Sequence, residues 1–269
     1  MRKQENYSDT RKKGPDSTGA ADEEGLTVLE GRNSVLEAMR AGRTIDRLFV
    51  QEGLQDGPIL TILREARKTD AIVKMVKKIR LDQMSETGHH QGVIAYAAAW
   101  EYSTVEEILE KAKMKGEPPF IVILDGIEDP HNLGAIIRSA NLAGAHGVII
   151  PKRRAASLTA AAVRASAGAV SYTPVAKVTN VGAAIEDLKK EGLWFVCADM
   201  DGECMYDLDL TGPIGLVVGS EGDGVSRLVK EKCDMIASIP MRGEIDSLNA
   251  SVAAGVLAWE IVRQRIKRG

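Results

Sequence analysis

The sequence predicts an α/β protein in which a small amino-terminal α/β domain precedes a larger domain with a mainly parallel, doubly wound sheet. Two observations predict this class. Short apolar runs alternate with helical patterns along most of the chain, as expected where crossover helices join parallel strands. One of these runs, residues 120–127, is short, apolar and bounded by turn residues, which is typical of a buried parallel strand.

The smaller domain should extend over residues 26–99. Its first helix is expected to be capped by Asn33 and to stop at Gly42. The pattern predicts helices at 33–42, 59–69 and 80–86, and strands at 47–50, 72–76 and 92–98. Residues 1–25 are polar, carry charges of both signs and lack the apolar core of a signal peptide, so we expect a disordered tail there.

The larger domain should comprise residues 119–269, after a connection at residues 100–118. This connection is a polar helical segment closed by Gly116 and two prolines, which indicates a flexible linker. Beyond it, the pattern predicts helices at 134–144, 156–168, 181–192 and 224–233, and strands at 120–127, 147–151, 171–178, 194–199, 215–221 and 235–240.

The last predicted helix carries an apolar stripe at steps of three or four residues, and we expect most of it to pack into the core. The stripe consists of Leu248, Val252, Val256, Trp259, Val262 and Ile266. Small residues beside it, Ala250, Ala253, Ala254 and Gly255, would allow another backbone to approach closely. Core packing does not explain the polar residues Ser247 and Asn249 at the start of this helix.

Composition limits the possible functions. The chain has 269 residues and a net charge of −3, so any contact with nucleic acid must come from local basic patches. No apolar run approaches the ~20 residues of a membrane span. The cysteines Cys197, Cys204 and Cys233 lack metal-ligand spacing, and we expect reduced thiols, no metal site and a cytoplasmic protein.

Three loops carry most of the polar chemistry of the larger domain. They are GIEDPHN after the strand at 120–125, SEGDGVS after GLVVG, and MRGEIDSLN after SIP. Each combines glycine, carboxylate and amide groups and leads into a helix, whose first N–H groups are unpaired donors for a ligand. The loop 219–224 lacks the Lys-Ser/Thr ending of a P-loop and the glycine order of a dinucleotide site.

The segments DPHNLGAIIRSA, GLVVGSEGDGVS and IPMRGEIDSLNASVAAGV resemble the three motifs of the SpoU (TrmH-like) ribose methyltransferases of the SPOUT class, and they occur in order over residues 120–262. GRNSVLEAM and HHQGVIA resemble the substrate-binding domain of the RlmB-type enzymes of large-subunit ribosomal RNA. The resemblance implies a carboxy-terminal trefoil knot that binds S-adenosylmethionine, and a homodimer. It also implies methyl transfer to a ribose 2′-hydroxyl of RNA, with a guanosine of 23S ribosomal RNA as the expected target. A transfer RNA substrate and a non-catalytic RNA-binding protein are the alternatives.

The resemblance also assigns site residues. Cofactor binding falls to Gly219, Ile239 and Leu248. The active-site positions are Asn132, Arg138, Glu221, Ser247 and Asn249. The arginine is the proposed base of the family, but a guanidinium with a pKa above ~12 should stay protonated, so a bidentate phosphate clamp is an equally physical role.

Contacts to RNA are expected at basic and polar positions outside these motifs. The candidates are His90, Gln91, Lys152, Arg153 and Arg154. Histidine and glutamine in a loop suit splayed RNA bases, although a histidine with satisfied hydrogen bonds is the more common case. Residues 64–80 contain seven basic and two acidic residues, which is either an RNA contact or a solvated surface.

Overall fold

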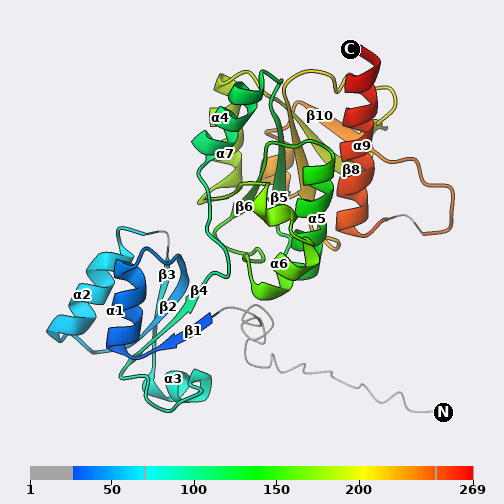
Figure 1. The fold of residues 1–269 in the computed structure, drawn as a ribbon. Coiled ribbons are helices and arrows are strands. Elements are labelled where there is room, and N and C mark those ends of the chain that lie inside the picture. Colours follow the sequence, from blue (N-terminus) through cyan, green and yellow to red (C-terminus); the bar gives the residue numbers. More distant parts are fainter. Residues whose placement is uncertain (1–26, 70, 246, 269) are drawn as a thin grey trace, which may run out of the picture.

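The computed structural model describes residues 27–69, 71–245 and 247–268, so the tail predicted at 1–25 lies outside the described residues. The chain forms two α/β units, each with its own sheet (Figure 1). The first unit contains β1 (Thr27–Glu30), α1 (Arg32–Arg40), β2 (Ile45–Gln51), α2 (Gly57–Ala66), β3 (Ile72–Val76), α3 (Lys78–Met84) and β4 (Val93–Ala97).

The first sheet has the strand order β1-β4-β2-β3, in which β4 runs antiparallel to both of its neighbours and β2 pairs parallel with β3. Helices α1 and α2 cover one face and α3 covers the other. Asn33 is not the cap expected from the sequence. Helix α1 begins one residue earlier, after Gly31, because the left-handed backbone of that glycine (φ 84°) turns the chain into the helix without a side-chain cap.

The second unit is built on a six-stranded parallel sheet with the order β10-β8-β9-β5-β6-β7. Its strands are β5 (Phe120–Asp125), β6 (Gly147–Pro151), β7 (Val175–Val178), β8 (Trp194–Cys204), β9 (Ile214–Gly219) and β10 (Met235–Ser238). Its helices are α4 (Val105–Lys115), α5 (Pro130–Leu142), α6 (Ala160–Ala165), α7 (Val181–Lys190), α8 (Arg227–Lys230) and α9 (Ala250–Arg268), with a 3-10 turn at Ala169–Ser171.

Two layers of helices cover this parallel sheet (Figure 1). Alternate residues of β5 face opposite sides, as the two-residue period of a strand requires. Phe120, Val122 and Leu124 pack with α5, α6 and α9, whereas Ile121 and Ile123 pack with α4, α7 and α8. The predicted doubly wound α/β class is therefore confirmed, and the knot expected in its last segments stays a prediction.

Helix α4 corrects the expectation of a flexible linker at residues 100–118. A capping box between Thr104 and Glu107 starts the helix, and Gly116 in the left-handed region (φ 66°) ends it. Its Ile108 is buried against β6, where a Cβ on Gly147 would lie 2.5 Å from the isoleucine Cγ1. The helix is thus packed into the larger unit, because its few apolar residues lie on one face despite a polar overall composition.

Helix α9 corrects the expectation about its apolar stripe. The buried side of the helix is the small-residue side, with Ala250, Ala254, Leu257, Ala258 and Ile261. Val252, Trp259 and Ile266 of the predicted stripe are instead 49%, 47% and 73% exposed. The physical reason is helix–helix packing: small residues let α9 lie directly against α5, so Val252, Trp259 and Ile266 face outward. Val256 and Val262 of the stripe are partly buried against the core, as predicted.

A buried ion pair joins the two units. Asp46 of β2 is 4% exposed, and its carboxylate accepts a hydrogen bond from Lys177 Nζ of β7. The same ammonium lies 4.1 Å from the ring centroid of Tyr102, whose hydroxyl accepts a hydrogen bond from the Leu158 backbone N–H. Burial, followed by the charge of Asp46, raises the pKa of Tyr102, so this phenol stays protonated. The contacts fix β2 of the smaller unit to β7 of the larger one.

Replacing Lys177 by methionine should destabilise the protein by about 3–5 kcal/mol, because the buried carboxylate of Asp46 then loses its cationic partner. The double variant Asp46→Asn, Lys177→Met should recover much of this loss. Lys190→Met is the matched control, since Lys190 and Asp187 form an ion pair whose side chains are both 72% exposed, and it should cost less than about 1 kcal/mol. Urea unfolding measures all three. A Lys177→Met variant as stable as the control would contradict the prediction.

Candidate active site

The three polar loops leave neighbouring strands at one edge of the parallel sheet. Strand β5 ends at Asp125, which pairs with Gly219 at the end of β9. The third loop follows β10 and leads into α9. Carboxyl ends of parallel strands form the usual ligand-binding edge of such sheets. The fold therefore collects the three motifs in one place.

Three side chains, one from each loop, form a closed hydrogen-bonded cluster. Asn132 Nδ2 donates to Glu221 Oε1 at 3.0 Å. Asn249 Nδ2 donates to Asn132 Oδ1 at 3.0 Å and also to Glu221 Oε1. Each side chain thus contacts both of the others. Glu221 Oε2 forms no hydrogen bond with any described residue, so half of this carboxylate is available to a ligand.

Asn249 also starts the last helix. Its Oδ1 accepts hydrogen bonds from the backbone N–H groups of Ser251 (2.9 Å) and Val252 (3.4 Å), and from the Ser251 hydroxyl at 2.5 Å. This is the hydrogen-bond pattern of a helix N-cap. With the amide oxygen held by the helix, the amide nitrogen must point toward Asn132 and Glu221. The cap therefore sets the orientation of the cluster.

Backbone packing shapes the loop that carries Glu221. Ser220 and Gly224 exchange two backbone hydrogen bonds of 3.2 and 3.0 Å, which close the turn. A Cβ on Gly219 would lie 1.9 Å from the carbonyl carbon of Gly224, so a side chain cannot fit there. The Asp125 carboxylate accepts a hydrogen bond from the Ser226 N–H at 2.8 Å and holds the far end of the loop.

A cavity of about 580 Å³ lies on one side of this loop. Its lining includes all three predicted cofactor residues, Gly219, Ile239 and Leu248, together with Ser247 and Glu221. The volume is within the range of small-molecule sites. Four carboxylates line it, from Asp199, Asp201, Glu221 and Asp223, and the described lining residues include no lysine, arginine or histidine.

A larger cavity of about 970 Å³ lies on the other side of the same loop. Its lining includes Asn132 and Glu221 of the cluster and two of the predicted RNA contacts, Arg153 and Arg154. Lys152 does not line it, although its backbone N–H donates to Val178 at 2.9 Å. Residues 220–224 line both cavities, so two ligands, one in each cavity, would meet at Glu221.

Arg138 is the one predicted active-site residue that lies neither in the cluster nor along either cavity. It lies six residues after Asn132 on α5, is exposed, and lines neither cavity. It forms no hydrogen bond or ion pair within the described part of the chain. On the same exposed side of α5, Leu142 is 65% exposed. Arg138 therefore points outward to solvent.

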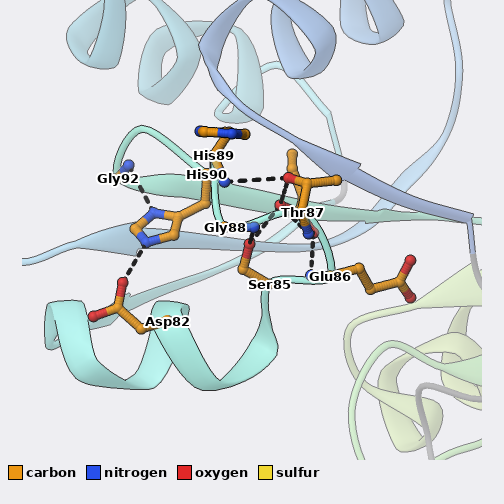
Figure 2. Close-up of polar contacts among 9 residues, drawn as sticks. Asp82, Ser85, Glu86, Thr87, Gly88, His89, His90 and Gly92 are labelled. Atoms are coloured by element: carbon orange, nitrogen blue, oxygen red, sulfur yellow. Dashed lines mark hydrogen bonds and ion pairs between the residues drawn. The ribbon is translucent and has the colours of Figure 1, made fainter.

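His90 in the smaller unit does not fit the expected RNA contact. The side chain is 5% exposed. Its Nδ1 accepts a hydrogen bond from the Gly92 N–H, and its Nε2 donates to Asp82, both at 2.9 Å (Figure 2). Both ring nitrogens are therefore used inside the protein, and the histidine has a structural role. Gln91 is exposed, but its Oε1 accepts a hydrogen bond from the Arg32 N–H at the start of α1.

The loop around His90 is pinned by a carboxylate that the sequence reading missed. Glu30 accepts hydrogen bonds from the Ser85 hydroxyl, the Glu86 N–H, and the Thr87 N–H and hydroxyl. Burial alone would raise the pKa of Glu30, but the hydrogen bonds from Ser85 and Thr87 outweigh it and lower the pKa overall. His89 projects from this fixed loop with its ring exposed (Figure 2). In the sequence, Glu30 is a single carboxylate before Gly31, and nothing in that local pattern predicts that it binds a loop more than 50 residues away.

Within the described ranges, no group of three or more histidine, cysteine, aspartate or glutamate side chains is placed to hold a metal ion. Nor does any helix in that part of the chain combine the length and apolar character of a membrane span.

Comparisons with known proteins match both units. Residues 119–259 match the model of the SpoU rRNA Methylase family, and residues 28–103 match the model for RNA 2′-O ribose methyltransferase substrate binding. A protein of Bacillus subtilis (strain 168) that is named as a TrmH family tRNA/rRNA methyltransferase, YacO, is 45% identical over 87% of this chain and 94% of its own length.

Two solved structures differ in how much of this chain they match. An S-adenosylmethionine-bound rRNA methyltransferase from Sinorhizobium meliloti covers 90% of this chain and 88% of its own, with 26% identity and a TM-score of 0.55. A TrmH/SpoU tRNA modifying enzyme from A. aeolicus covers only 61% of this chain and 81% of its own, with 30% identity and a TM-score of 0.53.

Asn249→Ser and Asn249→Ala should separate the two roles of Asn249. Serine can still cap α9, so we expect the free energy of unfolding to change by less than about 0.5 kcal/mol, whereas alanine should cost about 1 kcal/mol. Both variants lose the amide donors to Asn132 and Glu221, so the rate of any reaction that depends on the cluster should fall in both. Thermal unfolding of the two variants tests the cap. Equal destabilisation by serine and alanine would show that the cap does not stabilise the helix.

Proposed function

This chain belongs to the SpoU family of RNA 2′-O-methyltransferases, which use S-adenosylmethionine, and we propose that its substrate is a guanosine of 23S ribosomal RNA. The observation that carries the ribosomal assignment is the smaller domain. The ribosomal RNA enzyme of S. meliloti matches both units of this chain, whereas the tRNA modifying enzyme matches 61% of it. Transfer RNA is the alternative, because the B. subtilis relative is named for both substrates. Either substrate would be met in the cytoplasm.

The 580 Å³ cavity is proposed as the cofactor site. Gly219 lets the loop 220–224 approach closely enough to present its backbone, and Ile239 and Leu248 supply apolar contact. When bound, the cofactor supplies a methyl group on a sulfonium, an electrophile that is already activated. The protein then has to hold the ribose hydroxyl in line with that methyl group and accept its proton. Alignment of this kind can contribute up to ~7–11 kcal/mol.

The 970 Å³ cavity is proposed to receive the target nucleotide. Arg153 and Arg154 are exposed on its wall and can contact RNA phosphates. At its boundary with the cofactor cavity lies Glu221, held through Oε1 by Asn132 and Asn249. The free Oε2 can orient a guanidinium or the ribose. This fixed, half-used carboxylate between two cavities argues against the alternative of a non-catalytic RNA-binding protein.

Arg138 is proposed to act in a second copy of the chain. Arg138 and Leu142 are exposed on α5, and Val252, Trp259 and Ile266 are exposed on α9, which packs against α5; we propose that a homodimer covers these side chains. A two-fold interface brings the same face of each copy together, so the arginine of one copy can reach the cluster of the other. We favour the phosphate clamp over the base for Arg138, because a guanidinium stays protonated.

In the smaller domain, His89 rather than His90 is proposed as the base contact. Its ring is exposed on a loop that Glu30 and the His90–Asp82 hydrogen bond hold in place. An aromatic ring on a fixed support suits stacking with an unpaired RNA base. The basic residues Lys74, Lys78 and Arg80 are exposed on β3 and α3 and can add phosphate contacts.

Arg138→Ala should lower methyl transfer roughly 100-fold or more, because a charged contact made in the transition state is lost. The cofactor affinity should not change, since Arg138 lies outside the cofactor cavity. Arg138→Lys should also fail if the bidentate geometry is needed. The measurement is transfer of labelled methyl groups to 23S ribosomal RNA and, in parallel, to transfer RNA, followed by mapping of the 2′-O-methyl position. Preferred methylation of transfer RNA would overturn the substrate assignment.

Mixing two inactive variants tests the shared site. Arg138→Ala keeps the cluster, and Asn249→Ser keeps the arginine. In a mixed dimer, one site contains an intact arginine from one copy and an intact cluster from the other. Activity should therefore return to up to about a quarter of the wild-type rate per chain after subunit exchange. Each variant alone and the Arg138→Ala, Asn249→Ser double variant mixed with wild type are the controls. A mixture as inactive as its components would contradict the shared site.

A further inference from the structure

All charged side chains in the described lining of the proposed cofactor cavity are negative. Its described lining contains four carboxylates and no basic side chain. Two of the four already have partners. Glu221 accepts the amide hydrogen bonds of the cluster, and Asp199 forms an ion pair of 2.8 Å with Lys230, which lies outside the cavity. Burial raises the pKa of Asp199, but the hydrogen bonds from Lys230 and from the Asp201 N–H, together with the charge of Lys230, outweigh it and lower the pKa overall. This carboxylate therefore stays ionised, and Lys230 neutralises it.

Asp223 and Asp201 are the two carboxylates that remain, and only Asp201 lines the cofactor cavity alone. It lies on β8, two residues after Asp199, and its backbone N–H donates to Asp199 Oδ1 at 3.0 Å. Its own carboxylate is exposed and forms no hydrogen bond or ion pair with any described residue, although its charge contributes to raising the pKa of Lys230. Asp223, the other free carboxylate, lines both cavities, whereas Asp201 lines only the cofactor cavity. Asp201 therefore gives the β8 wall its net negative charge.

The two forms of the cofactor differ in charge at one atom. S-adenosylmethionine carries a sulfonium in addition to its ammonium and carboxylate, so its net charge is +1. In the transfer the bond between sulfur and methyl carbon breaks, its electron pair stays on sulfur, and the ribose oxygen bonds the methyl carbon as its proton leaves. S-adenosylhomocysteine then holds a neutral thioether and has no net charge. A carboxylate near the sulfur attracts the first form and not the second.

We propose that Asp201 makes this cavity selective for the charged methyl donor over its neutral product, so that methyl transfer itself weakens cofactor binding and favours product release. The inference rests on the proposed assignment of the cavity. It predicts which part of the ligand Asp201 senses: the sulfur charge, and neither the ammonium nor the adenosine hydroxyls, which both forms share. Because Asp201 is exposed to solvent, its attraction for the sulfonium should change the cofactor affinity roughly several-fold.

The test is calorimetry with three ligands: S-adenosylmethionine, S-adenosylhomocysteine, and the analogue in which a protonated amine replaces the sulfonium. In Asp201→Asn, the affinities of the two cationic ligands should fall roughly five- to tenfold, and that of the product should stay within about twofold. Asp201→Glu should retain the wild-type ratio. Asp207→Asn is the matched control, because Asp207 is an exposed carboxylate after β8 that does not line the cavity. Added salt should reduce the wild-type ratio more than the ratio of Asp201→Asn.

The outcomes separate this inference from the function on which it rests. Equal weakening of all three ligands would overturn it, since Asp201 would then contact a group that they share. Unchanged affinities in Asp201→Asn would also overturn it. A wild-type protein that binds neither cofactor form would overturn the cavity assignment as well. Thermal unfolding of each variant, together with the preserved ratio in Asp201→Glu, shows that the effect comes from charge and not from misfolding.

Discussion

The orientation of one amide side chain determines how the site is assembled. Asn249 must place its oxygen on the first N–H groups of α9, because these have no partners within the helix. Its nitrogen then has to face Asn132 and Glu221. The same hydrogen bonds tie the β10–α9 loop to the loops after β5 and β9, so α9 cannot shift on α5 without disturbing all three. The packing of α9 on α5 and the geometry of the hydrogen-bonded cluster therefore depend on each other.

The loop 220–224 depends on this constraint and divides two environments. On one side is a cavity lined by carboxylates, which suits a cationic ligand. On the other side, Arg153 and Arg154 face the space proposed for RNA, a polyanion. The wall between the two cavities is only a short turn thick, because residues 220–224 line both. Gly219 permits this thin wall, since a side chain there would collide with the Gly224 backbone.

How much could be predicted from the sequence depended on whether a feature is local. Alternating patterns predicted the strands and the three loops, because those signals come from neighbouring residues. Periodicity found the apolar stripe of α9 but did not show that Val252, Trp259 and Ile266 face outward, since small residues such as Ala254 can pack as closely as large ones. Burial of His90 and of the Asp46–Lys177 pair depends on contacts between distant segments. The resemblance supplied Arg138 as a site residue, but only the structure shows that it points away from its own cluster.

The exposed stripe of α9 has an optical consequence. Trp259 lies between Val252 and Ile266 at intervals of seven residues, in the middle of the uncovered face. Indole emission shifts to shorter wavelength when water is excluded, so any process that covers this face changes the fluorescence of the protein without an added label. Trp100 and Trp194 are also exposed, but Trp100 lies in the connection after β4 and Trp194 at the start of β8. Trp259 thus provides a label-free readout for the proposed dimer surface.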